Sequence, residues 1–216
     1  GVCYITFPAL EQCGVKHAFT TRIGGVSKGI YSSMNMSFSR GDDAADVTEN
    51  YRRICEIIGT DYRRCVLSKQ THTTNIRIVT ESDAGKGIIC ERDFDDTDGL
   101  ITDVPGITLV TQFADCTGLL FCDPKKRVIA AAHAGWRGTA GEIGRLTVEK
   151  MHDSFGCDPG DIRAGIAPSI GPCCFEVDQP VIDQFEKIKS YDVSKVIKDE
   201  GNGKYHVDLW KANCLS

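Results

Sequence analysis

Two almost entirely apolar segments on either side of a tight turn constrain this chain more than any other feature. Residues 116–122 and 127–133 flank residues 123–126, where Asp123 followed by Pro124 favours a type I turn. Each segment has the length of a strand, and strands without polar alternation are typical of a sheet that is buried on both faces. The sequence therefore predicts a central hairpin covered by other layers on both sides.

Helices and strands mix along the rest of the chain without strict alternation. Asp43 and Gly59 are typical first and last residues around a helix over 44–58. The other expected elements are helices over 139–153 and 179–188, and strands over 17–22, 63–68, 74–80, 107–112, 162–167 and 205–209. No repeat or proline-rich linker marks a boundary, so we predict a single α/β domain over 1–216 with a mixed sheet.

Composition excludes several classes of protein. The formal net charge of −5 argues against a surface that coats nucleic acid or an anionic membrane. The most apolar stretch, residues 107–121, is too short to span a bilayer, and no secretory signal peptide is visible. Eleven cysteines, an odd number without a CxxC motif, do not match the disulfide framework of a small secreted protein. We therefore expect a cytoplasmic protein whose cysteines are mostly reduced and buried.

The hairpin also brings together two side chains that can bind a metal. If residues 123–126 form the turn, Cys122 pairs with Arg127, and the same count places Cys116 opposite His133. Directly opposed residues have Cβ atoms about 4.5–5.5 Å apart, a spacing that suits two ligands of one zinc ion. The alternative is a buried structural cysteine and a hydrogen-bonded structural histidine.

A third ligand is required, and several histidines are available. His72 lies at the mouth of a predicted strand, in a loop position where functional groups are often placed. His17 and His206 are the alternatives, and spacing alone does not choose among the three. His152 lies late in a predicted helix, where it favours the negative end of that helix.

Groups that suit an anion flank the predicted ligands. Residues 134–138 join the hairpin to a predicted helix, whose first backbone N–H groups favour an anion, and Arg137 adds a bidentate donor. Arg22 precedes a second glycine-rich loop. The alternative is that the glycines only permit tight turns. Asp115 adds a carboxylate at the edge of an apolar strand, which is costly unless it is paired or functional.

Several segments together resemble the YfiH or laccase-domain family, also called the multicopper polyphenol oxidoreductase family. The matching segments are Thr21–Ser27, Tyr31–Met36, Gln70–His72, Ala114–Cys116, His133–Gly138, Ala167–Pro172 and Tyr205–Leu209. The Ala-Asp-Cys segment followed by His-Ala-Gly-Trp-Arg-Gly is the most specific part of this likeness.

The resemblance implies an αββα-type sandwich with mixed β-sheets, sometimes grouped with cysteine hydrolase-like folds. It also implies that zinc is bound by His72, Cys116 and His133. Family members are described as purine nucleoside phosphorylases that also deaminate adenosine and cleave methylthioadenosine. The implied partners are therefore a small purine nucleoside and phosphate.

Roles for further residues follow as hypotheses from this implied activity. We predict that Arg22 and Arg137 bind the phosphate and that Asn35 and Gln70 orient the nucleoside. Asp115 is the candidate general acid or base, or else it orients a metal ligand.

Three alternatives stay open at this stage. Copper-dependent phenol oxidation is suggested by the family's older name, but several copper centres need more imidazoles than five histidines without a His-x-His pair supply. A metal-free cysteine hydrolase would use Cys116 as nucleophile and His133 as base. A binding module with a structural zinc would need a fourth protein ligand, and only three are evident.

Overall fold

The predicted hairpin forms the middle of the molecule. In the computed structural model, which describes residues 1–216, strands β7 (Thr117–Asp123) and β8 (Val128–Ala134) pair antiparallel. All but one residue of each strand are buried, because layers on both sides cover the pair. The prediction of a hairpin that is buried on both faces is confirmed.

The turn of this hairpin has the predicted length of four residues but lies one position later in the chain. Asp123 pairs with Val128, so the loop consists of residues 124–127 rather than 123–126. Arg127 adopts a left-handed backbone with a φ of 57° and belongs to the loop instead of β8. Because a residue with a left-handed backbone cannot continue a strand, the pairing starts at Val128. Each residue of β8 therefore faces a residue of β7 two positions later than predicted.

The shift changes which residues face each other at the far end of the hairpin. His133 lies opposite Gly118, and Cys116 precedes the first residue of β7. The predicted direct pairing of Cys116 with His133 is therefore wrong, although both residues remain at the same edge of the sheet.

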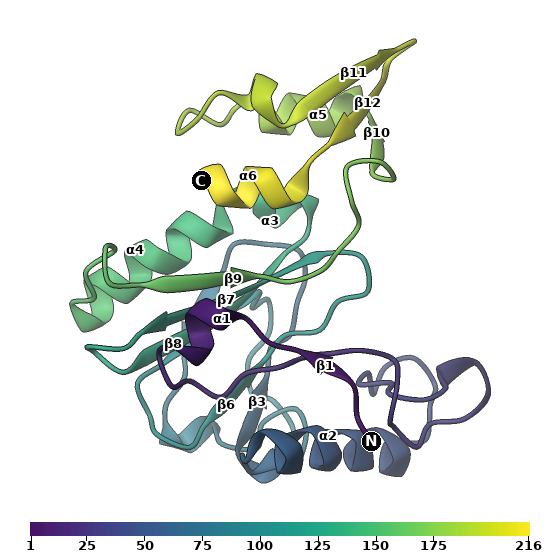
Figure 1. Cartoon of the computed structure of the whole chain (residues 1–216), viewed down its shortest axis with the longest axis vertical. Helices are drawn as coiled ribbons and strands as arrows, with labels where there is room; N and C mark the ends of the chain where they lie inside the picture. Colours follow the sequence, from purple (N-terminus) through teal and green to yellow (C-terminus); the bar gives the residue numbers. More distant parts are fainter.

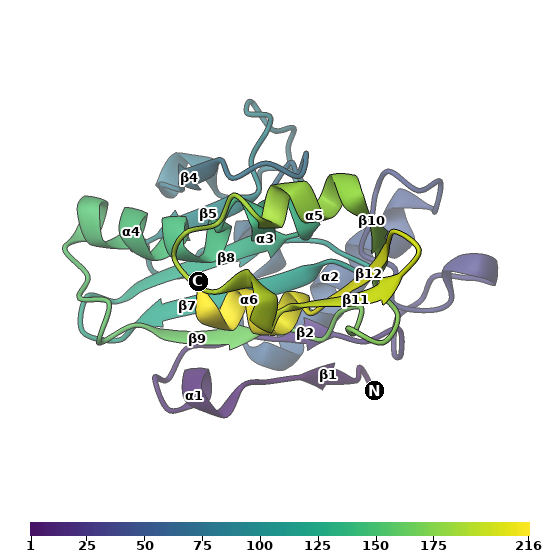
Figure 2. The same cartoon turned by 90° about the horizontal axis from the view of Figure 1, so that it is seen from above.

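The hairpin belongs to a mixed sheet of five strands in the order β4-β5-β8-β7-β9. The three further strands are β4 (Ile76–Ile78), β5 (Gly99–Thr102) and β9 (Arg163–Ile166). β4 and β5 run parallel, whereas the other neighbours run antiparallel. Figure 2 shows the five strands side by side in this order.

Four layers stack along the long axis in Figure 1. Helix α2 (Ala44–Ile58) forms the first layer, and the parallel pair of β3 (Cys65–Leu67) and β6 (Thr108–Val110) forms the second. The five-stranded sheet and helix α4 (Ile143–Phe155) are the third and fourth layers. This arrangement is the αββα sandwich with mixed sheets that the resemblance implied.

Buried side chains join each layer to the next. Cys55 of α2 packs in one cluster with Cys65 of β3, and Val66 of β3 packs in another with Leu100 of β5. Met151 of α4 packs against the other face of the five-stranded sheet. Burial of apolar surface at about 25 cal/mol per Å² makes these interlayer contacts the main stabilising contribution to the sandwich.

Helix α2 begins and ends where the sequence predicts. The side chain of Asp43 accepts a hydrogen bond from the backbone N–H of Ala45, and Gly59 ends the helix in a left-handed conformation with a φ of 72°. Val47 and Tyr51 of this helix are buried.

The single helix predicted over 139–153 is wrong. Two helices are present, α3 (Trp136–Ala140) and α4, and the chain between them turns at Gly141 and Glu142. Glu142 adopts a left-handed backbone with a φ of 56°, which an uninterrupted α-helix cannot contain.

A smaller antiparallel sheet of order β10-β12-β11 lies beyond α3 and α6 at the top of Figure 1. Phe185 and Leu209 are central to its own apolar cluster. Its elements are β10 (Glu176–Asp178), α5 (Gln179–Phe185), β11 (Ile197–Gly201), β12 (Lys204–Val207) and α6 (Leu209–Leu215). The remaining short elements are β1 (Tyr4–Ile5), α1 (Pro8–Glu11), β2 (Phe19–Thr20), and the 3₁₀ turns η1 (Gly29–Tyr31), η2 (Tyr62–Arg64), η3 (Glu81–Asp83) and η4 (Val193–Lys195).

Every predicted strand is present, and most of them are shorter than predicted. Four strands were not predicted: β1, β5, β10 and β11. None of the helices has the length and apolar character needed to cross a bilayer. All eleven cysteines are unpaired thiols, but the expectation that most are buried is wrong, because seven lie in turns, loops and chain or helix ends. The four that are buried are Cys55, Cys65, Cys122 and Cys157.

Candidate metal centre

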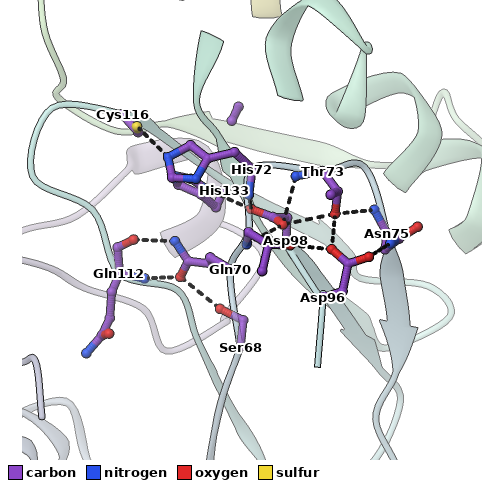
Figure 3. Close-up of polar contacts among 12 residues, drawn as sticks. Ser68, Gln70, His72, Thr73, Asn75, Asp96, Asp98, Gln112, Cys116 and His133 are labelled. Carbon is purple, nitrogen blue, oxygen red and sulfur yellow. Dashed lines mark hydrogen bonds and ion pairs between the residues drawn. The ribbon is translucent and has the colours of Figure 1, made fainter. Parts of the chain in front are cut away.

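Three candidate ligands converge at one edge of the central sheet. The ligand atoms of His72, Cys116 and His133 all lie within 4.8 Å of one another. The Cys116 Sγ lies 4.0 Å from the His72 Nε2, and the two imidazole rings are nearly perpendicular at a centroid distance of 4.8 Å. Figure 3 shows the three side chains pointing toward one another.

Strand alternation explains why His133 points into this space. Ala132 and Ala134 belong to the apolar cluster that packs against α4. Successive side chains of a strand point to opposite faces, so His133 projects away from α4, toward the β3–β6 layer. Cys116 immediately precedes the neighbouring strand β7 and lies beside this position. His72 approaches from the loop that precedes β4.

The donor set fits a zinc ion. Thiolate and imidazole bind zinc at about 2.3 Å and 2.0–2.1 Å, so donor atoms at these separations need to move by roughly 1 Å to share one ion. Gly135 leaves the intervening space open, because a Cβ there would lie 3.0 Å from a ring carbon of His72 and 3.2 Å from the Cys116 Sγ. No fourth histidine, cysteine or carboxylate joins the group. Three protein ligands with one open position are typical of a catalytic zinc site.

Exposure increases across the ligand set. His133 is 2% exposed, Cys116 is half-buried and His72 is exposed. The open side of the group therefore faces solvent, where a small substrate can approach.

A buried aspartate connects the two histidines. Asp98 is 0% exposed, and one of its carboxylate oxygens lies 2.7 Å from the His133 Nδ1 and 3.1 Å from the backbone N of His72. The other oxygen accepts hydrogen bonds from the backbone N–H groups of Thr71 and Thr73, each at 3.0 Å. Figure 3 shows Thr73 beside Asp98. Asp98 was not among the residues predicted from the sequence. It directly precedes β5, so the cost of a carboxylate at the edge of an apolar strand could have identified it.

The groups in this cluster shift one another's pKa values. Burial alone would raise the pKa of Asp98, but hydrogen bonds from His133 and the backbone hold it at about 2. Burial alone would lower the pKa of His133, but hydrogen bonds with Asp98 and Cys116 raise it to about 9. Burial lowers the pKa of His72, and the charge of His133 lowers it further.

The other three histidines lie apart from the group and have their own partners. The His17 Nε2 accepts the backbone N–H of Phe7, and His206 pairs with Glu200. His152 contacts the backbone carbonyl of Cys157 at the end of α4. Of the histidines that spacing left open, His72 alone joins Cys116 and His133.

Asp115 is exposed and its carboxylate has no hydrogen-bond partner within the chain. It precedes β7 and is not part of a buried strand. The sequence argument that this carboxylate is costly to bury therefore does not hold. Its position directly before Cys116 leaves it free to contact a substrate.

A groove of about 1940 Å³ opens beside the ligands. Sites for small molecules usually occupy about 300–1,000 Å³, so a nucleoside would fill only part of it. Seven of the eight site residues named from the sequence line this groove: Arg22, Asn35, Gln70, His72, Asp115, Cys116 and His133. Phe19 and Phe113 also line it, with their rings stacked at 5.5 Å.

The two amides in the wall of the groove are engaged within the chain. Asn35 exchanges hydrogen bonds with Ser37 and donates to Asp42. Gln70 makes two hydrogen bonds with the backbone of Gln112 (Figure 3). Both side chains therefore shape the wall of the groove.

The two arginines occupy different surroundings. Arg22 is exposed and lines the groove. Arg137 does not line it, and its guanidinium lies 4.2 Å above the ring of Trp136 at the start of α3. After burial and the charge of His133, the charge of Arg137 also lowers the pKa of His72.

Comparison with known proteins identifies the family. The chain is 38% identical over 206 residues to a protein of Geobacillus stearothermophilus named purine nucleoside phosphorylase YlmD, covering 94% of this chain and 74% of that protein. It is 33% identical over 198 residues to a protein of an unknown prokaryotic organism named adenosine deaminase RL5, covering 91% and 75%. The crystal structure of the hypothetical protein YfiH from Bacillus licheniformis superposes with a TM-score of 0.87 at 36% identity, covering 91% and 74%.

A family model described as multi-copper polyphenol oxidoreductase laccase matches residues 16–216. This match and the relatives confirm the resemblance found in the sequence. The chain therefore belongs to the multi-copper polyphenol oxidoreductase laccase family.

Proposed function

We propose that this chain is a zinc-dependent purine nucleoside phosphorylase that also deaminates adenosine at the same site. The observation that carries the proposal is a group of one thiol and two imidazoles with an open side at the wall of a groove. The names of the relatives, purine nucleoside phosphorylase and adenosine deaminase, support this choice of substrate class.

His72, Cys116 and His133 would hold the ion. Zinc in such a site supplies Lewis acidity and lowers the pKa of a water molecule to about 7. The chain supplies the rest of the site. Phe19 and Phe113 offer aromatic surface beside the ligands, which suits the flat face of a purine.

In phosphorolysis, a phosphate oxygen bonds to the ribose C1′ while the bond from C1′ to the purine nitrogen breaks. The purine leaves with the electron pair and takes up a proton, and ribose 1-phosphate remains. In our proposal Arg22 and Arg137 bind the phosphate, since guanidinium groups form paired charge-assisted hydrogen bonds with it. Asn35 and Gln70 keep the wall of the groove in the shape that orients the nucleoside.

Asp115 is the proposed general acid or base. Its exposed carboxylate directly precedes Cys116, so it can reach a substrate placed against the ligand set. In phosphorolysis it would give a proton to the departing purine. In deamination of adenosine it would move protons between water and the departing ammonia.

Copper-dependent phenol oxidation fits the donor set less well. Several copper centres need many imidazoles, and the group contains two. The remaining three histidines lie apart from it, bound to a backbone N–H, a backbone carbonyl and a glutamate. Oxygen uptake with a phenolic substrate and copper would contradict the proposed function.

The direct test is incubation of the zinc-loaded protein with adenosine, inosine, guanosine and methylthioadenosine, with and without phosphate. Chromatography should detect free base and a sugar phosphate only when phosphate is present. It should detect inosine formed from adenosine even when phosphate is absent. Release of no base and no inosine under either condition would overturn the proposal. Acylation of Cys116 by an ester in the metal-free protein would point to the cysteine hydrolase instead.

Substitution of Arg137 by alanine should raise the KM for phosphate by about tenfold or more, because charge-assisted hydrogen bonds contribute about 1.5–3 kcal/mol. Arg163→Ala is the matched control, since Arg163 is also exposed but pairs with Cys122 at the opposite end of β7. Initial rates at varied phosphate provide the measurement. An unchanged KM in Arg137→Ala would remove this residue from the phosphate site.

A further inference from the structure

We propose that Asp98 is the positioning residue of the metal centre and that its carboxylate sets the orientation of both histidine ligands. This inference rests on the proposed function, because it concerns the same three ligands. It assigns a role to a residue that contacts both histidines and lies on the side of them opposite Cys116 (Figure 3).

The contact with His133 fixes which ring nitrogen is available to a metal. The carboxylate lies 2.7 Å from the Nδ1, so this nitrogen carries the proton and donates it. The lone pair then belongs to the Nε2, the nitrogen left to face His72 and Cys116. A carboxylate in this position also makes the imidazole a stronger ligand.

The contact with His72 acts through the backbone. Successive N–H groups of Thr71, His72 and Thr73 all donate to the carboxylate of Asp98, at 3.0 or 3.1 Å. His72 has a φ of 65°, a left-handed conformation that is uncommon for residues other than glycine. Successive backbone N–H groups that converge in a turn form a concave site for an anion. The anion here is Asp98, and the turn that it stabilises presents the His72 ring to the other two ligands.

The burial of Asp98 distinguishes its contacts with the histidines from an ordinary surface ion pair. Asp98 is 0% exposed and receives no lysine or arginine. Its negative charge is balanced only by N–H groups, one hydroxyl and His133. A cation bound by the histidines would therefore be stabilised by a carboxylate that no lysine or arginine neutralises.

Asp96 provides a matched control within the same turn. It is exposed and accepts hydrogen bonds from the side chains of Thr71, Thr73 and Asn75, but it contacts neither histidine. Loss of Asp96 should loosen the turn without changing the proton on His133.

The experiment measures zinc affinity by competition with a chromophoric chelator, for wild type, Asp98→Asn and Asp96→Asn. Asp98→Asn should weaken zinc binding by about 10–100-fold, and Asp96→Asn should leave it within about threefold of wild type. Cobalt-loaded Asp98→Asn should also lose intensity in the visible bands of tetrahedral cobalt. Urea unfolding of the metal-free proteins separates a change in fold stability from a change in ligand geometry.

Equal zinc affinity and equal cobalt spectra in wild type and Asp98→Asn would overturn the inference while leaving the proposed function intact. Absence of zinc binding in wild type would overturn both. Where Asp98→Asn does not fold, ¹⁵N spectra of histidine-labelled, zinc-loaded wild type decide the question. The proton of His133 should be on the Nδ1, and a proton on the Nε2 would contradict the role of Asp98.

Discussion

Two buried aspartates in this molecule are held in opposite ways. Asp83 is 1% exposed and is paired with Lys86 at 2.8 Å and Arg77 at 2.9 Å, and it also accepts the backbone N–H of Thr80. Asp98 is 0% exposed, yet it has no cationic partner except a histidine that belongs to the ligand set. Two neighbouring cations balance the charge of Asp83, whereas the charge of Asp98 is available to the metal centre. In this pair, the partners of the carboxylate rather than its burial separate the structural role of Asp83 from the role proposed for Asp98.

The largest effect that we expect from this comparison is on folding. Asp83→Asn should lower the free energy of unfolding by about 3 kcal/mol, because it leaves two cations without their buried partner. Zinc affinity should stay at the wild-type value, since Asp83 contacts no ligand. Urea unfolding measures the free energy of unfolding, and competition with a chelator on the same preparation measures the zinc affinity. A parallel loss of zinc affinity would show that the two carboxylates do not have separate roles.

A smaller effect is expected when the space between the ligands is filled. Gly135 has a φ of −62°, which alanine adopts without strain, but the new methyl group would crowd His72 and Cys116. Gly135→Ala should weaken zinc binding about tenfold, equivalent to about 1.4 kcal/mol, with little change in the stability of the metal-free protein. Gly160→Ala, in an exposed turn far from the ligands in sequence, is the control. Unchanged zinc affinity in Gly135→Ala would mean that the ion is bound elsewhere.

The smallest effect concerns pH. Burial alone would raise the pKa of Asp83, but Lys86, the Thr80 amide and Arg77 outweigh it and hold this pKa well below its usual range. The resulting stability is complete above the ordinary carboxyl pKa of about 3.9 and is lost as the pH falls toward the lowered value. Asp83→Asn should therefore flatten the fall in stability below about pH 4. Identical acid profiles by circular dichroism would contradict this assignment.

Sequence reasoning succeeded where local chemistry determines the structure. Asp43 and Gly59 determine the ends of α2 by capping, so the helix could be predicted to the residue. The doubly buried hairpin followed from two apolar segments and the Asp-Pro turn between them. Its register did not, because Arg127 enters the loop in a left-handed conformation that no local preference indicated.

The candidate site was only partly accessible from the sequence. Cys116 and His133 were proposed from the hairpin through a register that is wrong, and they meet because they lie at the same edge of the sheet. His72 was selected by family resemblance, since its position depends on a turn formed around a residue that follows 26 positions later. That residue, Asp98, precedes a four-residue strand with no periodic pattern, so neither the strand nor its carboxylate was predicted.

The most direct test of the metal centre is zinc K-edge X-ray absorption of the chain purified without added chelator, with metal content measured on the same sample. We expect about one zinc per chain, with one sulfur ligand near 2.3 Å and nitrogen or oxygen ligands near 2.0–2.1 Å. Loss of the sulfur contribution in Cys116→Ser would confirm its origin. A four-sulfur shell, or a wild-type spectrum without any sulfur ligand, would contradict a centre built from His72, Cys116 and His133.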